Sequence, residues 1–376
     1  MNYTFSIITF IFLFISSSCS FQSTLFNRLA KETEGENMII SPLSIFQALS
    51  LCSNGANGQT LQEMLELLQI DSIDELNNIN YKILSAIKQF STLEIANGIM
   101  TRFTPLEDFA KIAEKYLAPI EPLIDVDQVN NWCNNKTHGK IDKILDELDP
   151  YALMVILNAV YFKGEWKLKF DERLTRELPF YNLGSEEVTI DTMSQIDYFQ
   201  YYEDKNVQAI KLDFEKDFMS AIIILPAEGM DINKYINSLS LSNSEYKQMI
   251  EGLKYSKVHL QLPKFELEYK ILLNDILKDL GMYEAFDPSM ADFTNLKEEK
   301  DIFVNRVIHK TYLKVFEDGC EAAAVTAIEM AGGSAMPREE EIHDMKVNRP
   351  FLFLLKNSQL PEEYDLLFMS KIETLG

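Results

Sequence analysis

Residues 317–350, with the sequence EDGCEAAAVTAIEMAGGSAMPREEEIHDMKVNRP, change from small to glycine-rich to acidic side chains within one segment. If residues 320–330 are extended, their side chains alternate between two faces. Both glutamates of that stretch then share one face, and the other face carries no charge. The uncharged face consists of Cys320, Ala322, Ala324, Thr326, Ile328 and Met330. This alternation predicts a strand that can enter a sheet with one side on a core and the other in water.

The same residues are also compatible with a helix, in which Glu321, Val325 and Glu329 would line one solvated face. Composition alone favours this second interpretation, an alanine-rich surface helix followed by a loop. In the strand, a large or charged side chain at 320, 322, 324 or 326 would be buried without a partner. Gly319 provides a hinge before the segment, and Gly332-Gly333 provides a flexible tip.

The rest of the chain predicts a soluble α+β protein. The chain has 376 residues, of which 47% are hydrophobic, so it has ample material for a packed core. Its formal net charge of −23 argues against nucleic acid or an anionic membrane as the main partner. Helical patterns dominate the first part and strand patterns the last, with no βαβ alternation, no repeat and no dividing linker.

Local patterns place several elements. Phe21, Leu25 and Leu29 fall on one helix face. Ser41 suits the N-cap of a second helix, and Thr60 begins a capping box for a third. The predicted helices cover 21–31 and 271–281 and begin after Ser41 and at Thr60. The predicted strands are 151–162, 220–226, 258–269, 351–355 and 364–372, the first buried on both faces and the third bent at Pro263.

The first twenty residues, MNYTFSIITFIFLFISSSCS, are uncharged and contain an apolar run from Phe5 to Ile15. That run is too short for a membrane span and is typical of a secretory signal cleaved near Ser20. The alternative is a hydrophobic N-terminal helix that stays attached. The signal predicts a secreted, extracellular protein, in which the sequon Asn135-Lys136-Thr137 would be usable for glycosylation. The four cysteines, Cys19, Cys52, Cys133 and Cys320, do not form a disulfide framework.

Motifs for catalysis, cofactors and metals are missing from the sequence. Its four histidines have no metal-ligand spacing, and no GxSxG, GxxxxGK[ST] or GxGxxG motif occurs. We therefore expect no cofactor, no metal and no enzymatic activity. A catalytic triad is assembled only in space, so its absence from the sequence is weak evidence. His309, just before KTYLKVF, is expected to be a hydrogen-bonded core histidine.

EDGCEAAAVTA resembles the hinge of the reactive-centre loop of serpins, and further motifs follow the order of that family. They are NMIISPLSI, NGANGQTLQEM, THGKI, LNAVYFKGEWKLKF, SAIIILP, LPKFELE, DLGMYEAFDPSMADFTNL, VIHKTYLKVFEDG and VNRPFLFLLKN. The resemblance extends from Phe21 to the C-terminus. It implies one serpin domain at 21–376, after a signal peptide at 1–20, with an exposed reactive-centre loop at about 317–348.

The resemblance also implies an α+β serpin fold with about eight or nine helices and three β-sheets. It implies a monomeric suicide inhibitor of serine proteases, whose cleaved loop enters the main sheet while the protease remains covalently attached. The matching hinge and inserting residues are Glu317, Asp318, Gly319, Cys320, Ala322, Ala323, Ala324 and Thr326. The residues matching the polar cluster and tryptophan that govern sheet opening are Ser41, Ser44, Asn158, Trp166 and His309. Arg349-Pro350-Phe351 resembles the distal anchor.

Several positions depart from the family pattern. Cys320 stands where a small hydroxyl residue is usual, and oxidation of its thiol would block insertion. Val325 is larger than the usual alanine. MSKI at 369–372 replaces a more usual glycine-arginine pair, and the segment 337–346 is long and acidic.

The register of the family places the scissile bond at Gly333-Ser334, and its small residues suit elastase-like proteases. Met336 suits chymotrypsin- or cathepsin G-like enzymes and Arg338 suits trypsin-like enzymes, but Pro337 and a run of glutamates follow them. We therefore favour an elastase-, cathepsin G- or chymotrypsin-like target over a trypsin-like one. Residues 71–90 contain no basic cluster, so heparin is not an expected partner. The alternatives are a non-inhibitory serpin that acts as carrier, chaperone or storage protein and, with no motif to support it, an enzyme using Asp or Glu pairs.

Overall fold

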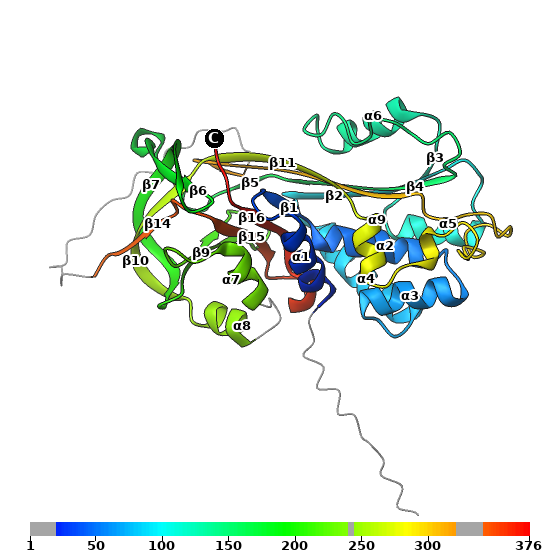
Figure 1. The fold of residues 1–376 in the computed structure, drawn as a ribbon, viewed down its shortest axis with the longest axis horizontal. Coiled ribbons are helices and arrows are strands. Elements are labelled where there is room, and N and C mark those ends of the chain that lie inside the picture. Colours follow the sequence, from blue (N-terminus) through cyan, green and yellow to red (C-terminus); the bar gives the residue numbers. More distant parts are fainter. Residues whose placement is uncertain (1–19, 240–243, 321–340) are drawn as a thin grey trace, which may run out of the picture.

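The computed structural model describes residues 20–239, 244–320 and 341–376. Nine α-helices lie in these ranges, and most of them gather at one end of the molecule (Figure 1). They are α1 Phe21–Glu32, α2 Pro42–Ser53, α3 Gly58–Leu68, α4 Ile73–Ile87, α5 Glu107–Lys115, α6 Val126–Lys136, α7 Ile232–Ser238, α8 Ser244–Glu251 and α9 Asn274–Asp279. Short 3-10 helices are η1 Glu172–Leu174, η2 Glu284–Phe286 and η3 Glu362–Tyr364.

A long seven-stranded sheet crosses the molecule, with α6 on one face and α2 on the other (Figure 1). Its order is β3-β2-β4-β12-β13-β5, and β11 also pairs with β12. The strands are β2 Leu93–Thr101, β3 Ile120–Pro122, β4 Met154–Phe162, β5 Gly164–Glu165, β11 Phe265–Leu272, β12 Arg306–Phe316 and β13 Gly319–Cys320.

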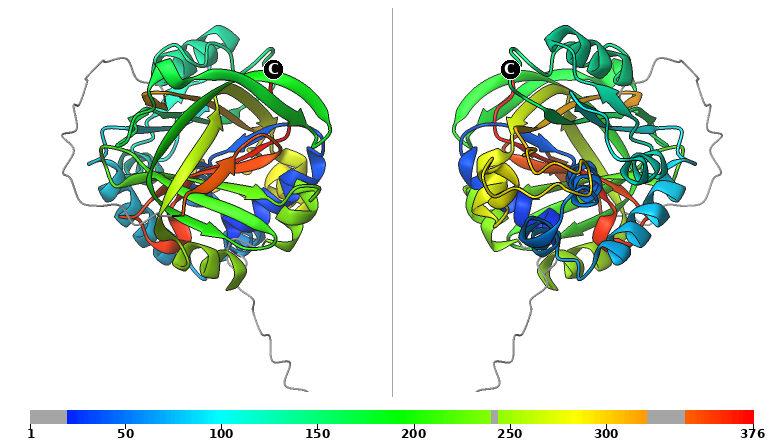
Figure 2. Two further views of the ribbon diagram at one scale, coloured as in Figure 1. Left: turned by 90° about the vertical axis from the view of Figure 1, so that its left-hand side faces the viewer. Right: turned by 90° about the vertical axis from the view of Figure 1, so that its right-hand side faces the viewer.

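The second sheet has nine strands in the order β1-β16-β15-β9-β8-β7-β10-β14, with β6 paired to β7. The strands are β1 Met38–Ile40, β6 Arg176–Asn182, β7 Glu186–Glu203, β8 Val207–Asp213, β9 Met219–Pro226, β10 Lys254–Pro263, β14 His343–Lys346, β15 Phe351–Asn357 and β16 Leu366–Ile372. Strand β7 is 18 residues long and pairs with β6 and β10 as well as with β8. It therefore connects β6, β10 and β14 to the central strands β8, β9 and β15. The end views show this curved group around one end of the molecule (Figure 2).

The structure confirms most of the predicted elements and corrects three of them. Strand β4 is buried over its whole length, as its apolar run predicts. The predicted strand at 258–269 divides at Lys264 into β10 in one sheet and β11 in the other. The capping box at Thr60 is wrong, because the helix begins at Gly58 with Asn57 as its N-cap. The helix predicted at 271–281 is shorter, because its first residues complete β11.

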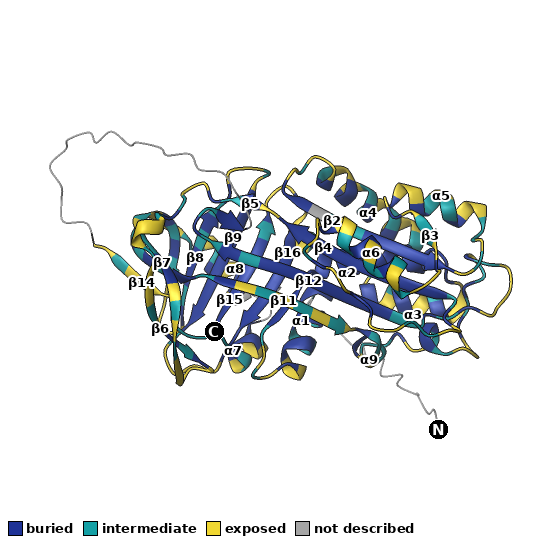
Figure 3. Ribbon diagram, turned by 90° about the horizontal axis from the view of Figure 1, so that it is seen from above, coloured by how far each residue is buried: buried dark blue, intermediate teal, exposed yellow. Residues whose placement is uncertain are grey.

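The main core lies between the two sheets and the helices, and burial follows the inner strands and α2 (Figure 3). All residues of α2 are buried, because the helix is covered on every side. A smaller core lies between α6 and the long sheet and contains Trp132. A Cβ atom at Gly98 of β2 would lie 2.6 Å from the Trp132 ring, so glycine is required for this close contact.

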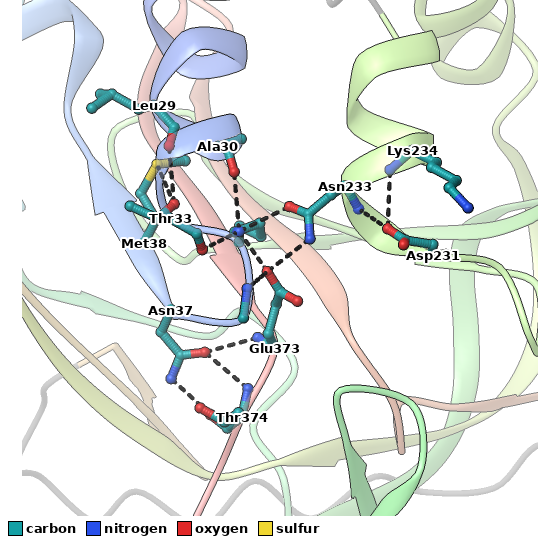
Figure 4. A network of polar contacts seen from close by, with 12 residues as sticks. Leu29, Ala30, Thr33, Asn37, Met38, Asp231, Asn233, Lys234, Glu373 and Thr374 are labelled. Atoms are coloured by element: carbon teal, nitrogen blue, oxygen red, sulfur yellow. Dashed lines mark hydrogen bonds and ion pairs between the residues drawn. The ribbon is translucent and has the colours of Figure 1, made fainter. Parts of the chain in front are cut away.

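Lys371 of β16 is fully buried and holds several parts of the core together. Figure 4 shows its partners Ala30, Thr33, Asn233 and Glu373 close to one another. Its ammonium group donates to the carbonyl oxygens of Ala30 and Thr33 at the end of α1 and to Asn233 Oδ1 of α7. It also forms an ion pair of 2.5 Å with Glu373, which is itself buried. Lys371, the lysine of the MSKI motif, thus has hydrogen-bond acceptors for all protons of its ammonium group, as a buried ammonium requires.

Candidate functional site

Strands β4 and β12 are parallel neighbours along one part of the long sheet and separate along the next. They pair from Arg306 with Val155 to Thr311 with Val160. Beyond this point β13 lies between β12 and β5, antiparallel to both. The two-residue strand β13 therefore lies at the place where the central strands of the sheet diverge.

A buried polar cluster connects β4 and β12 to the start of α2. His309 Nδ1 donates to Asn158 Oδ1 at 2.5 Å, while His309 Nε2 accepts from the Ser41 backbone N–H at 3.0 Å. Ser44 Oγ lies 2.8 Å from Asn158 Oδ1 and 3.0 Å from the Ser41 carbonyl oxygen, and its single proton is shared between these two acceptors. Burial lowers the pKa of His309 to about 3, so the ring is neutral. The structure thus brings together the four polar residues predicted from sequence and confirms His309 as a hydrogen-bonded core histidine.

Two members of this cluster were missed by sequence reasoning. Asn158 Nδ2 donates to Asn97 Oδ1 of β2 at 2.6 Å, and Thr311 Oγ1 donates to the Ile39 carbonyl of β1 at 2.8 Å. Asn97 and Thr311 are both buried. A polar residue inside an apolar strand is a signal of such a network, because it would be costly without a partner.

Trp166 lies at the diverging end of the sheet, beside β13. Its indole Nε1 donates to the Phe316 carbonyl at 3.0 Å, and its backbone N–H donates to the Asp318 carbonyl at 2.8 Å. The ring stacks on Phe214 with the centroids 4.3 Å apart. Lys169 adds an ion pair with Asp318 at 3.3 Å. Trp166 therefore holds the turn between β12 and β13 through its ring and its backbone.

Glu317 is a buried acid at the beginning of this turn. Thr175 Oγ1 donates to its carboxylate at 2.7 Å, and Lys264 forms an ion pair with it at 3.2 Å. Although burial opposes ionisation, these contacts lower the pKa of the Glu317 carboxyl. The turn is thus attached to the body of the protein by a buried negative charge.

Gly319 and Cys320 form β13 and are both buried. Gly319 has a φ of +153°, and a Cβ atom there would lie 2.0 Å from the Gly164 carbonyl oxygen. Cys320 pairs with Val315 on one side and Gly164 on the other. Burial raises the pKa of its thiol well above the ordinary value, so the thiol is protonated.

The remaining predicted site residues are placed as follows. Arg349 Nε donates to the Pro226 carbonyl at 2.9 Å, which attaches the distal end of the loop to β9. Asn135 is exposed near the end of α6. Ala322, Ala323, Ala324, Thr326, Gly333, Ser334, Met336 and Arg338 lie outside the described residues. Within 20–239, 244–320 and 341–376, no group of three or more His, Cys, Asp or Glu side chains could hold a metal ion. A search of the same residues gives no helix with the length and apolar character of a membrane span.

The family model described as serpin (serine protease inhibitor) matches residues 16–374. The chain belongs to the serpin family. This serpin is 32% identical to Serpin B8 of Homo sapiens over 355 residues, which cover 90% of this chain and 94% of that protein. It is 30% identical to the leukocyte elastase inhibitor of Xenopus tropicalis over 369 residues, with 92% and 96% of the two chains covered.

Solved structures agree with this assignment. This serpin superposes on native tengpin, a thermophilic serpin, with a TM-score of 0.84 and 30% identity, covering 100% of this chain and 96% of that one. Human thyroxine-binding globulin gives a TM-score of 0.85 and 25% identity, covering 95% and 98%. The α+β serpin fold predicted from the motifs is therefore confirmed. The described strands pair into two sheets where three were expected, because the long β7 joins two groups of strands into one sheet. The family as a whole associates this chain with protease inhibition, and its members also include thyroxine-binding globulin.

Proposed function

We propose that this serpin is a suicide inhibitor of serine proteases, in which the cleaved loop enters the long sheet between β12 and β4. The observation that carries the proposal is β13. Its two residues already lie between β12 and β5, directly before the small-residue run that begins at Ala322. An additional strand would therefore extend β13, which is already paired in the sheet, and would not have to begin between fully paired strands.

The register of β13 assigns partners to the inserting residues. Cys320 stands opposite Val315 on β12 and Gly164 on β5. If the cleaved loop continues in this antiparallel register, residue 326 comes to stand between His309 and Asn158. Thr326 is small and carries a hydroxyl group, so it can replace the His309–Asn158 contact with hydrogen bonds of its own. The side chain at 326 thus suits the polar position that insertion would open.

Burial in the sheet also explains why small residues are needed at positions 322 and 324. In this register, residue 322 stands opposite Leu313 and Phe162, and residue 324 stands opposite Thr311 and Val160. All four of these neighbours are buried in the present sheet. A large or charged side chain at 322 or 324 would have to be buried among them without a partner. The alanines at both positions support an inserting strand.

For the target, we propose an elastase-, cathepsin G- or chymotrypsin-like protease cleaving at Gly333-Ser334, with Met336 and Arg338 as alternative positions. Small residues at the proposed bond support an elastase-like enzyme. One relative is itself named a leukocyte elastase inhibitor. The specificity pocket of a protease discriminates between side chains by modest energies. We therefore expect the register of insertion, more than the side chain at the cleaved position, to determine which bond is the scissile one.

A carrier without inhibitory activity is the second candidate, supported by the similarity to thyroxine-binding globulin. The two functions make opposite predictions for a protease that cuts the loop. An inhibitor retains the protease in a covalent complex, whereas a carrier releases it unchanged.

We further propose that the chain is secreted as a monomer after removal of residues 1–20 and acts outside the cell without heparin. The apolar, uncharged run of those residues supports secretion. Some relatives are named as intracellular, such as intracellular coagulation inhibitor 2 of Tachypleus tridentatus, 32% identical over 362 residues, covering 91% of this chain and 86% of that protein. N-terminal sequencing of protein from the culture medium tests this proposal, and a chain retained in the cell with residues 1–20 intact would contradict it.

The inhibitory function is tested by incubation with elastase-, chymotrypsin- and trypsin-like proteases, followed by denaturing electrophoresis and sequencing of the released peptide. A complex that survives SDS is expected with an elastase- or chymotrypsin-like enzyme. Ala324→Arg should abolish the complex while cleavage continues, because the arginine would be buried on insertion. Glu321→Arg, on the opposite face of the strand, is the matched control and should retain it. Clean cleavage by every protease would overturn the proposal.

A further inference from the structure

A serine, a histidine and an aspartate line up on three neighbouring strands. Ser194 and His259 are far in sequence from the predicted loop, and Asp344 lies near its C-terminal end, distal to the proposed scissile bond. Ser194 Oγ of β7 lies 3.1 Å from His259 Nε2 of β10. His259 Nδ1 lies 2.9 Å from Asp344 Oδ1 of β14. The two ring nitrogens are thus in contact with a hydroxyl group on one side and a carboxylate on the other.

The strand register explains why these three residues meet. His259 and Asp344 are direct partners in the parallel pair of β10 and β14. Ser194 is the partner of Gln261, two residues from His259, in the antiparallel pair of β7 and β10. Residues two apart on a strand share a face, so Ser194 reaches His259 along a diagonal. On the opposite face, Leu260 and its neighbours Val258, Leu262 and Met345 are fully buried, which fixes the strands against the core.

In a neutral ring, the contacts assign the proton positions of the histidine. Asp344 is an acceptor, so Nδ1 carries the proton and donates it to the carboxylate. Nε2 then presents a lone pair and accepts the Ser194 hydroxyl proton. This is the order of groups that activates a serine, in which the carboxylate orients the ring and the ring serves as general base. Polar side chains that merely meet on the surface of a sheet need not be arranged as carboxylate, histidine and serine in this order.

A hollow of about 350 Å³ lies beside the histidine. His259, Gln261 and Asp344 line it together with Leu178, Pro179 and Tyr181 of β6, and Ser194, which does not line the hollow itself, is reached through His259 Nε2. Lys346 also lines the hollow, with its Nζ 3.8 Å from Asp344 Oδ2. The combination of an apolar wall and a nearby cation suits a small acyl group whose carbonyl oxygen gains negative charge during attack.

We propose that Ser194, His259 and Asp344 form a second, nucleophilic site that reacts with small activated acyl esters. Ser194 Oγ attacks the ester carbonyl carbon and transfers its proton to His259 Nε2. The bond to the leaving alcohol breaks, and the alcohol takes the proton from Nε2, which leaves an acyl-serine. A water molecule, deprotonated by the same nitrogen, releases the carboxylic acid and restores Ser194.

The reaction is expected to be slow and limited to esters with good leaving groups. The side chains of His259 and Asp344 are 29% and 59% exposed, so water screens the charges that stabilise the tetrahedral adduct. Amide bonds, which need more stabilisation of that adduct, lie outside the proposed substrate class. Of the predicted loop, the site uses only Asp344, which lies distal to the proposed scissile bond, so the site can work whether or not the chain inhibits proteases.

The test is to incubate the full chain, without any protease, with a fluorophosphonate and to follow its intact mass. One phosphonyl group should be added, and peptide mapping should locate it on Ser194. The variants His259→Gln and Asp344→Asn should each be labelled at least about 10-fold more slowly, because general-base assistance contributes roughly 10²–10⁴-fold. Hydrolysis of p-nitrophenyl acetate should fall in the same variants.

Ser256→Ala on β10 is the matched control, because Ser256 Oγ donates only to a backbone carbonyl, that of Lys254. This control should be labelled at the rate of the unsubstituted protein. Ser194→Cys gives a second readout if Ser194→Ala perturbs the sheet, since the thiol should be alkylated faster with His259 present than in a Ser194→Cys, His259→Gln double variant. The proposal is overturned if Ser194 is not labelled, or if labelling and alkylation rates do not depend on His259.

Discussion

His309 of β12 and Asn158 of β4 stand directly opposite one another in the parallel strand pair, and the ring donates a hydrogen bond of 2.5 Å to the amide oxygen. Both residues are buried. This contact closes the sheet at the position that residue 326 would occupy after insertion. The same two side chains thus stabilise the closed sheet and lie on either side of the position that residue 326 of the proposed strand would take.

Replacing Asn158 with alanine should destabilise the intact protein. His309, Ser44 and Asn97 would each lose a hydrogen-bond partner, and a buried unsatisfied group costs about 1–3 kcal/mol. Urea unfolding should show a lower free energy of unfolding by at least that amount. Asn80→Ala is the control, since Asn80 is buried but donates only to the Leu76 carbonyl within α4. Equal losses in the two variants would argue against a special role for the cluster.

The pH dependence of stability should contain two opposing contributions. Burial lowers the pKa of His309 from 6.5 to about 3, so unfolding takes up a proton between these values. Its stabilising contribution is complete above pH 6.5 and declines as the pH falls toward 3, by up to about 1.4 kcal/mol per unit. Burial raises the pKa of Asp365 from 3.8 to about 6 despite its ion pair with Lys356. The native state therefore binds this proton more tightly, and stability declines as the pH rises from 3.8 to 6.

Single substitutions should separate these contributions between pH 4 and 6. Asp365→Asn should make the free energy of unfolding fall more steeply with decreasing pH than in the unsubstituted protein. His309→Gln should change the slope in the opposite direction. The measurement is a series of urea unfolding curves at fixed ionic strength. Identical slopes in all three proteins would exclude both assignments.

Gly319→Ala should disrupt the start of the additional strand. The new Cβ atom would meet the Gly164 carbonyl oxygen at 2.0 Å and the Glu165 Cα at 2.8 Å, so β13 has to move out of the sheet. Hydrogen exchange should show faster exchange in 315–320 together with a lower melting temperature. Gly184→Ala is the matched control, because Gly184 has a φ of +77° but nothing within 4 Å of the added Cβ atom. A Gly319→Ala protein with unchanged exchange would show that β13 tolerates a side chain.

Lys371→Met should be strongly destabilising, because it leaves the Glu373 carboxylate buried without its cation. Removal of one partner of a buried pair typically costs about 3–5 kcal/mol. The double substitution Lys371→Met, Glu373→Gln should be less destabilised than the single one, since the buried charge is then gone. Thermal unfolding of the three proteins measures the difference. A double variant that is no more stable than the single variant would contradict the pairing.

Much of the fold was predictable because the buried strands and helices have clear local patterns. The apolar run of β4 and the face of α1 formed by Phe21, Leu25 and Leu29 are examples. The capping box at Thr60 failed because tertiary contacts replaced it. Thr60 Oγ1 donates to Glu284, and Glu63 accepts from the backbone N–H groups of Tyr283 and Glu284. A local motif cannot reveal such distant partners.

The polar cluster was predictable only through the resemblance to serpins, because Ser41, Asn158 and His309 are far apart in the chain. Its extension to Asn97 and Thr311 depends on which strands become neighbours. The proximity of Ser194, His259 and Asp344 likewise depends on the register of three strands. The spacing of these residues in the sequence does not predict it. Sequence patterns reveal local structure, whereas sites assembled across strands require the fold.

Insertion of the cleaved loop is tested most directly by the melting temperature of the protein before and after cleavage of the loop by a catalytic amount of protease. A strand added between β12 and β4 would bury residues 322, 324 and 326 and complete the backbone hydrogen bonds of both neighbours. The cleaved protein is therefore predicted to melt well above the intact protein. An unchanged or lower melting temperature, with cleavage verified by mass, would show that the loop does not enter the sheet.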